Sequence, residues 1–265
     1  MSNAITIKNK DEYIPFIFYS YLLGLILSIA SALTIEKYSI WSLDYPSKYL
    51  LDIGKVGFSS YYDFSSLNCT KFPCLRKSFR FILRTFLGLL LAPIVSFDLL
   101  FGYALNMRNY YANRFDSTTI NIIKSNISLF YRDVHGASSA VTFSNPTDSN
   151  WINPPEFNFF RFIDDFVLEN SDKHTEKMRN YIALYGLFRT LALISVLLFW
   201  ATLMHLFISD VNQIVLLIFL AVLLFLAFFE YIGFVKFYRR YSNEVLMALV
   251  AILNARTQRA NNEAI

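Results

Sequence analysis

The chain has 265 residues, of which 55% are hydrophobic and 17% are charged, and its mean hydropathy is +0.40. These values exclude an ordinary soluble domain, and the 27 phenylalanines exclude a disordered chain. The net charge of +4 includes no block of five or six like charges, so it does not indicate binding to nucleic acid. The sequence therefore predicts an all-α integral membrane protein, with the lipid bilayer as its first partner.

Four apolar segments are long enough to cross a bilayer, because about 20 apolar residues in a helix cover a hydrocarbon core about 30 Å thick. They are residues 13–35, 81–104, 183–208 and 213–235. The second segment carries Arg84, a central Pro93 and Asp98. It is expected either to span or to enter and leave on one side, so the prediction is three or four transmembrane helices.

Basic residues predict the orientation, because cytosolic flanks of spans are enriched in Lys and Arg. They lie before residue 183 and after residue 235, whereas the turn between the last two segments carries only Asp210. We expect this turn outside the cytosol and residues 236–265 inside it, as a helical tail. The bias towards Asn, Lys, Ile, Tyr and Phe suggests an AT-rich genome, and we expect a bacterial inner membrane.

The charge of the connecting region 36–80 bears on whether the second apolar segment spans the bilayer. It carries seven Lys and Arg residues, which favour the cytosol, and a cytosolic position requires a re-entrant second segment. Complete spans are the commoner outcome for apolar runs of this length, and non-helical backbone at membrane depth must be covered by protein or water. Both alternatives stay open.

Region 105–182 is expected to form a small helical cytosolic domain. Apolar residues from Ile123 to Val134 recur every three or four positions, after the cap signal "DSTT" and before a terminating Gly136. The Ser-, Asn- and Pro-rich stretch that follows is expected to be a loop. Asn153 and the two prolines after it predict the start of a second helix.

The last two helices are expected to continue out of the membrane. The stretch from Asp172 to about Ile208 contains no proline, which predicts a helix about 55 Å long. Beyond the fourth segment an apolar stripe continues at helical spacing. Its members are Phe234, Tyr238, Tyr241, Val245, Leu249 and Ile252. The stripe needs a partner, and the helices between residues 105 and 169 are the nearest candidates.

The sequence predicts no catalytic site, metal site or cofactor. The three histidines, His135, His174 and His205, belong to no metal-ligand pattern, and no glycine-rich phosphate loop is present. Cys69 and Cys74 are spaced C-x4-C, which fits neither a zinc site nor a disulfide-rich scaffold, and we expect free thiols.

Two features within the apolar segments predict contacts. Gly24, Ser28 and Ala32 recur every four residues and would let another helix approach closely. The ionisable residues Asp98, Arg189 and Glu230 are costly in lipid and are expected to face protein or water. If the spans pack antiparallel, the three residues lie at about the same depth. There they would form either a structural ion pair or a polar constriction lining a water-filled path.

Three functions are compatible with this sequence. The first is an oligomeric pore, channel or membrane effector, gated through cytosolic helices that receive a signal or a soluble partner. The second is a membrane enzyme acting on a lipid-like substrate, with Asp133, His135, Asp164 and Asp165 as candidate groups. Adjacent carboxylates on a helix point about 100° apart, so a solvated surface is the simpler interpretation of Asp164 and Asp165. The third is a scaffold that holds a soluble partner at the membrane.

Overall fold

The computed structural model describes residues 10–53, 73–105, 107–110, 112–134, 142–143, 151–153, 158–208 and 212–263. This part of the chain is helical apart from one antiparallel pair of two-residue strands. Three of its helices are long and apolar enough to cross a membrane. The prediction of a helical chain with at least three such segments is therefore confirmed.

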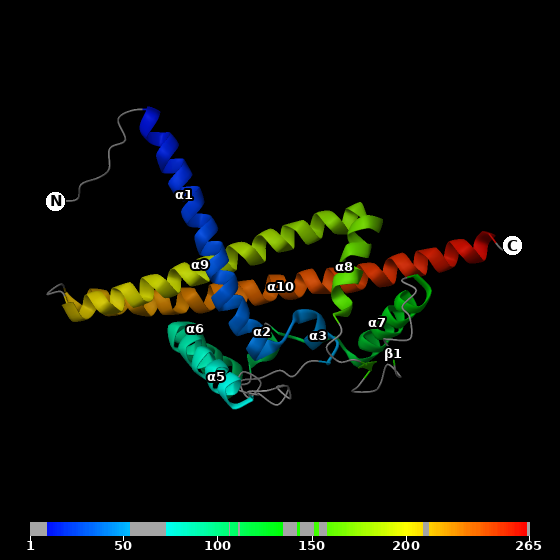
Figure 1. The fold of residues 1–265 in the computed structure, drawn as a ribbon, viewed down its shortest axis with the longest axis horizontal. Coiled ribbons are helices and arrows are strands. Elements are labelled where there is room, and N and C mark those ends of the chain that lie inside the picture. Colours follow the sequence, from blue (N-terminus) through cyan, green and yellow to red (C-terminus); the bar gives the residue numbers. More distant parts are fainter. Residues whose placement is uncertain are drawn as a thin grey trace.

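A hairpin of two long helices forms the axis of the molecule. Helix α9 (Asp172–Ile208) and helix α10 (Gln213–Glu263) lie side by side along the longest dimension in Figure 1. The bounds expected for α9 are confirmed. The side chain of Asn212 starts α10 by accepting a hydrogen bond from the amide of Ile214 at 3.1 Å. The turn around Asp210 lies outside the described residues.

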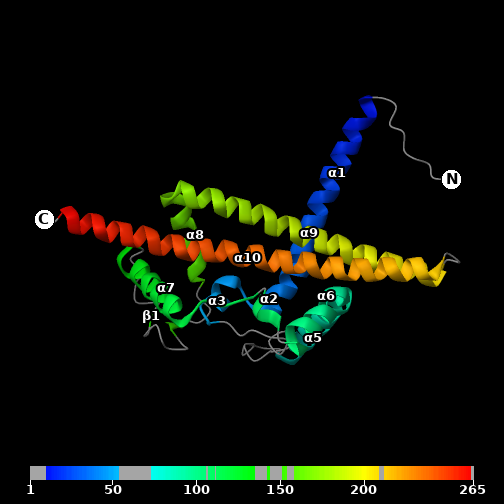
Figure 2. The same cartoon turned by 180° about the vertical axis from the view of Figure 1, so that it is seen from behind.

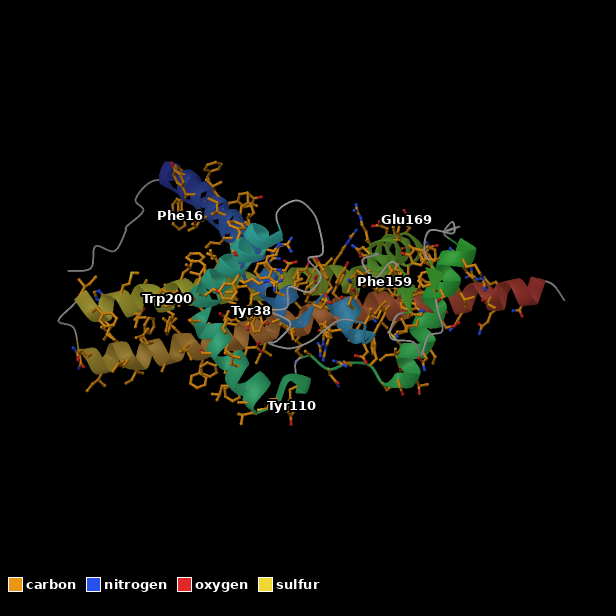
Figure 3. The ribbon with its side chains drawn as sticks, turned by 60° about the horizontal axis from the view of Figure 1, so that its bottom comes forward. Phe16, Tyr38, Tyr110, Phe159, Glu169 and Trp200 are labelled. Carbon is orange, nitrogen blue, oxygen red and sulfur yellow. The ribbon has the colours of Figure 1, made fainter. Side chains whose placement is uncertain are left out.

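Helix α1 (Lys10–Ser31) meets the hairpin only near its own C-terminal end. Figures 1 and 2 show the rest of it projecting away from α9 and α10, and Figure 3 shows Phe16 near its free end. The helix continues through a π-helical turn, η1 (Ala32–Glu36), into α2 (Lys37–Leu43). The helical run thus extends eight residues beyond the predicted segment 13–35.

The residues after α2 pack beside the half of the hairpin that lies away from its turn. We call this part, residues 172–185 and 236–263, the tail half. Asp44, at φ 65°, ends α2 and redirects the chain into α3 (Pro46–Leu50), which packs on α10. The Asp52 carboxylate then pairs with Arg114. The beginning of region 36–80 is therefore part of the hairpin's packing.

The second apolar segment is broken. Helix α5 (Pro73–Leu90) and helix α6 (Ala92–Phe97) meet at Leu91 with a bend of 84°. Pro93 lies in the first turn of α6, where its missing amide N–H leaves no helical hydrogen bond unmade. The same residue prevents α5 from continuing through this point as one unbroken helix. The indole of Trp200 on α9 donates a 2.7 Å hydrogen bond to the carbonyl of Leu90, so a group exposed by the break is satisfied. A π-helical turn, η2 (Asp98–Ala104), and a 3-10 turn, η3 (Met107–Tyr110), follow.

The remaining elements pack on the tail half. Helix α7 (Ser117–Leu129) begins where expected, with the Asp116 carboxylate accepting from the Thr119 amide at 2.9 Å. It continues as η4 (Phe130–Val134), and Gly136, the expected end, lies outside the described residues. Strands β1 (Thr142–Phe143) and β2 (Ile152–Asn153) lie within the stretch predicted to be a loop.

Helix α8 (Phe159–Asn170) starts later than expected. Asn153 pairs with Thr142 in the strand ladder, so it cannot also cap a helix, and Asn158 occupies the cap position instead. The apolar stripe of α10 is buried as expected, with Phe234, Val245 and Leu249 at 0% exposure. Its partners are α7 and α8, as predicted, together with α3, which was not.

Candidate functional site

Arg189 is held by the end of α1. Its Nη1 donates to the Glu36 carboxylate, its Nε donates to Ser31 Oγ at 3.1 Å, and its Nη2 lies 3.5 Å from the carbonyl of Ser28. The Arg189 and Glu36 side chains are only 12% and 24% exposed. The ion pair therefore joins α9 to α1 in a largely buried position. Glu36 was not singled out by the sequence, although it directly follows the first apolar segment.

The other two predicted intramembrane residues have separate partners. Glu230 accepts a 2.6 Å hydrogen bond from Ser195 Oγ, and Asp98 accepts one at 2.9 Å from the hydroxyl of Tyr38. Arg189 and Glu230 were expected to meet, but Arg189 pairs with Glu36 and Glu230 pairs with Ser195. Arg189 and Ser195 are six residues apart, which places them about 120° apart around α9. Depth along the hairpin alone did not predict which face each side chain occupies.

The predicted small-residue track divides into two parts. Ser28 and Ala32 are half-buried, and Ser28 lies at the contact with α9. Gly24 is exposed, and a Cβ added there would meet no described atom within 4 Å. The large side chains around it, including Tyr21, Leu25 and Ile29, are between 48% and 73% exposed. This face of α1 is therefore open for a lipid or for another helix.

A pocket of about 460 Å³ lies beside the tail half. The start of α3, the first turn of α8 and the facing sides of α9 and α10 line it. Its lining residues are Tyr45, Pro46, Ser47, Lys48, Asn158, Phe159, Phe160, Arg161, Asp164, Tyr185, Tyr238, Tyr241 and Ser242. The size is within the range of ligand sites, and the wall combines aromatic rings with charged and hydroxyl groups. Of these residues, the sequence predicted only Asp164 as a candidate functional group, and it predicted Tyr238 and Tyr241 to be part of the apolar packing stripe.

Asp164 is half-buried in the wall of this pocket. The hydroxyl of Tyr241 hydrogen-bonds to its carboxylate, whereas its Oδ1 is buried without a hydrogen-bond partner among the described residues. Burial raises the pKa of Asp164, the Tyr241 hydrogen bond opposes this shift, and the charge of Asp165 adds to it. Burial likewise raises the pKa of Tyr241, so that hydroxyl stays a donor at neutral pH.

His174 has a structural position near the pocket end of the hairpin. Its Nδ1 lies 2.7 Å from Glu244 Oε1, and Lys177 lies 3.3 Å from the same oxygen, so the start of α9 is fastened to α10. His205 is exposed near the other end of α9. The other side chains that the sequence analysis considered lie outside the described part of the chain; they are those of Cys69, Cys74, Asp133 and His135.

Comparisons with known proteins do not assign this arrangement: no family model, no curated protein and no solved structure matches the chain.

Proposed function

We propose that this chain is an oligomeric membrane effector that forms a pore or channel and is controlled through its tail half. The observation that carries the proposal is the continuity of the hairpin. Helices α9 and α10 run without a break from their apolar halves into the pocket-bearing tail half. A ligand or soluble partner that shifts α9 against α10 at the tail would move the apolar halves as well, because both belong to the same rigid helices.

In this proposal α1, α9 and α10 span the bilayer and α5 with α6 is re-entrant. The chain leaves the tail half after residue 53 and is back beside it at residue 114. Support comes from the Asp52–Arg114 ion pair and from the amide of Phe115, which donates to the carbonyl of Leu50 at 3.4 Å. A segment that starts and ends on one side of a bilayer crosses it an even number of times. A single bent apolar segment then enters and leaves on the same side.

The basic residues flanking α9 and α10 orient this arrangement with the tail half in the cytosol. Region 36–53 then also lies in the cytosol, in agreement with its lysines, and the N-terminus lies outside. Trp200 and the packing of α6 on α9 and α10 cover the broken backbone, as a re-entrant segment requires. The bacterial inner membrane stays a prediction from the sequence.

Assembly is proposed to use the open face of α1. The polar groups Asp98, Glu36, Arg189 and Glu230 all have partners within one chain, so a water-filled path is more readily formed between copies than within a monomer. Gly24 lies on an exposed face, where another α1 can approach closely.

Reconstitution of the Gly24→Leu variant tests this function. The wild-type protein is expected to be a homo-oligomer in mild detergent and to release dye from liposomes or carry current across them. Leucine at position 24 should weaken association by about tenfold, which corresponds to about 1.4 kcal/mol, because its side chain prevents the close approach that small residues permit. Light scattering and dye release should then fall together.

Gly186→Leu is the matched control, since Gly186 also has no described atom within 4 Å of an added Cβ but lies on α9. It should leave mass and release unchanged. A monomeric wild type, or a wild type that neither releases dye nor carries current, contradicts the proposal.

A further inference from the structure

The unsatisfied oxygen of Asp164 indicates what the pocket lacks. A carboxylate that is half-buried needs a donor or a positive charge, and among the described residues only the hydroxyl of Tyr241 supplies a hydrogen bond here. Oδ1 has none among the described residues. An ammonium group entering the pocket would supply both a donor and the opposite charge.

The aromatic wall beside Asp164 also favours a cation. The rings of Tyr185 and Tyr238 are 5.1 Å apart between centroids, and those of Tyr185 and Tyr241 are 6.3 Å apart, so three rings from two helices pack together in the pocket wall. The faces of aromatic rings attract cations, most strongly where water is excluded. The carboxylate of Glu36 also acts on Tyr185 and Tyr238, but at Tyr185 the paired guanidinium of Arg189 opposes its effect.

Other residues of the pocket wall carry positive charge. Lys48 from α3 and Arg161 from α8 line the pocket, and neither forms an ion pair or hydrogen bond with a described side chain. Arg161 lies in the first turn of α8, whose cap residue Asn158 makes no side-chain cap hydrogen bond. Lysine and arginine side chains are the usual protein ligands of phosphate.

We propose that this pocket binds a zwitterionic phosphate ester, with its ammonium group against Asp164 and the three tyrosine rings and its phosphate between Lys48 and Arg161. This inference rests on the proposed function in that it names the ligand of the controlling tail half. Tyr185 lies two residues inside the third apolar segment and Tyr238 lies three residues beyond the fourth. The pocket is thus at the level of lipid headgroups, and a phosphatidylethanolamine headgroup is the source that its position favours. A soluble phosphoethanolamine-like compound shares the same chemistry.

Native mass spectrometry of the full-length, delipidated protein in detergent tests the proposal. Lysophosphatidylethanolamine should bind about tenfold more tightly than lysophosphatidylglycerol, which has the phosphate but no ammonium, because only the ammonium forms a charge-assisted hydrogen bond with Asp164; tenfold corresponds to about 1.4 kcal/mol. Phosphoethanolamine itself is the second arm. If lysophosphatidylethanolamine binds and phosphoethanolamine does not, the ligand is a lipid. If both bind, the pocket recognises the headgroup chemistry that they share. The proposal is overturned if neither lysophosphatidylethanolamine nor phosphoethanolamine binds, or if the two lysolipids bind equally.

Matched variants locate the binding. Asp164→Asn should remove the preference for the ammonium lipid, and Lys48→Gln with Arg161→Gln should weaken both lysolipids by about tenfold. Glu169→Gln, on the same helix but outside the pocket wall, is the control and should bind as the wild type does. Retained preference in a folded Asp164→Asn protein, judged by circular dichroism, overturns the assignment. Because binding is measured without a membrane, a protein that binds but forms no pore refutes only the proposed function.

Discussion

Arg189 shows how a charged residue within a long apolar helix is accommodated. Its guanidinium contacts a carboxylate, a hydroxyl and a carbonyl, all of them from residues 28–36. Three contacts of this kind satisfy most of its donors and offset the cost of removing the charge from water. The pair with Glu36 therefore fixes where α1 crosses α9.

Removal of Glu36 alone should destabilise the protein strongly. Glu36→Leu leaves a largely buried guanidinium without its counter-charge, which costs about 3–5 kcal/mol for a fully buried pair and falls near the lower bound here, because Glu36 is 24% exposed. The double variant Glu36→Leu, Arg189→Leu should recover most of this loss. Thermal unfolding in detergent measures both.

Glu169 provides the comparison for that experiment, because it is an exposed glutamate on α8 (Figure 3) that takes no part in the contacts of Arg189 given above. Glu169→Leu should change the free energy of unfolding by no more than about 0.5 kcal/mol. If the double variant is no more stable than Glu36→Leu, the pair is not what holds Arg189, and the assignment fails.

At the scale of elements, the hairpin depends on one close approach between α9 and α10. A Cβ placed on Gly233 would lie 2.7 Å from Cδ1 of Phe188 and 3.0 Å from its Cγ. The Cγ atom is anchored near the backbone, so the ring cannot simply turn aside. Gly233 is therefore required for the present separation of the two helices, and Phe188 in turn stacks on Phe237 at 5.5 Å.

Gly233→Ala should destabilise the hairpin by about 1–3 kcal/mol, the usual cost of adding a methyl group to a packed contact. Gly186→Ala is the matched substitution on the facing helix, where an added Cβ meets no described atom. It should be neutral or should stabilise by up to about 1 kcal/mol, since alanine is the better helix former. Equal melting temperatures for the two variants would contradict the close contact.

At the scale of the whole molecule, the two ends of the bent segment decide the topology. The Asp52–Arg114 pair is about half exposed and contributes little to stability, but it places residues 52 and 114 beside each other at the tail half. In the proposed topology, region 36–53 and the C-terminal tail share one side of the membrane, and the start of α1 lies on the other.

Cysteine labelling in intact cells tests this topology in a Cys69→Ser, Cys74→Ser background. An impermeant thiol reagent should modify cysteines placed at Ser2 and Asn212 and should spare those placed at Tyr45 and Asn261. Lysis should make the last two reactive, which controls for occlusion. Labelling of Tyr45→Cys in intact cells would mean that the bent segment spans, and labelling of Asn261→Cys would reverse the orientation.

The sequence by itself determined the elements whose signals are local. Apolar runs and the absence of proline predicted α9 in full, the cap at Asp116 predicted the start of α7, and helical periodicity predicted the buried stripe from Phe234 to Leu249. Each of these depends on neighbours within a few residues along one helix, where spacing and geometry are directly linked.

Only the tertiary structure decided which side chains meet. The tertiary structure pairs Arg189 with Glu36, supports Leu90 with Trp200 and gathers Tyr185, Tyr238 and Asp164 around one pocket. These contacts join residues between 21 and 153 positions apart. Within the hairpin, the depth of a side chain was predicted but its face was not. Depth follows from counting residues along a helix, whereas the face that a side chain presents depends on how neighbouring helices are rotated and packed. That rotation is set by the summed packing of all elements, so no single stretch of sequence specifies it.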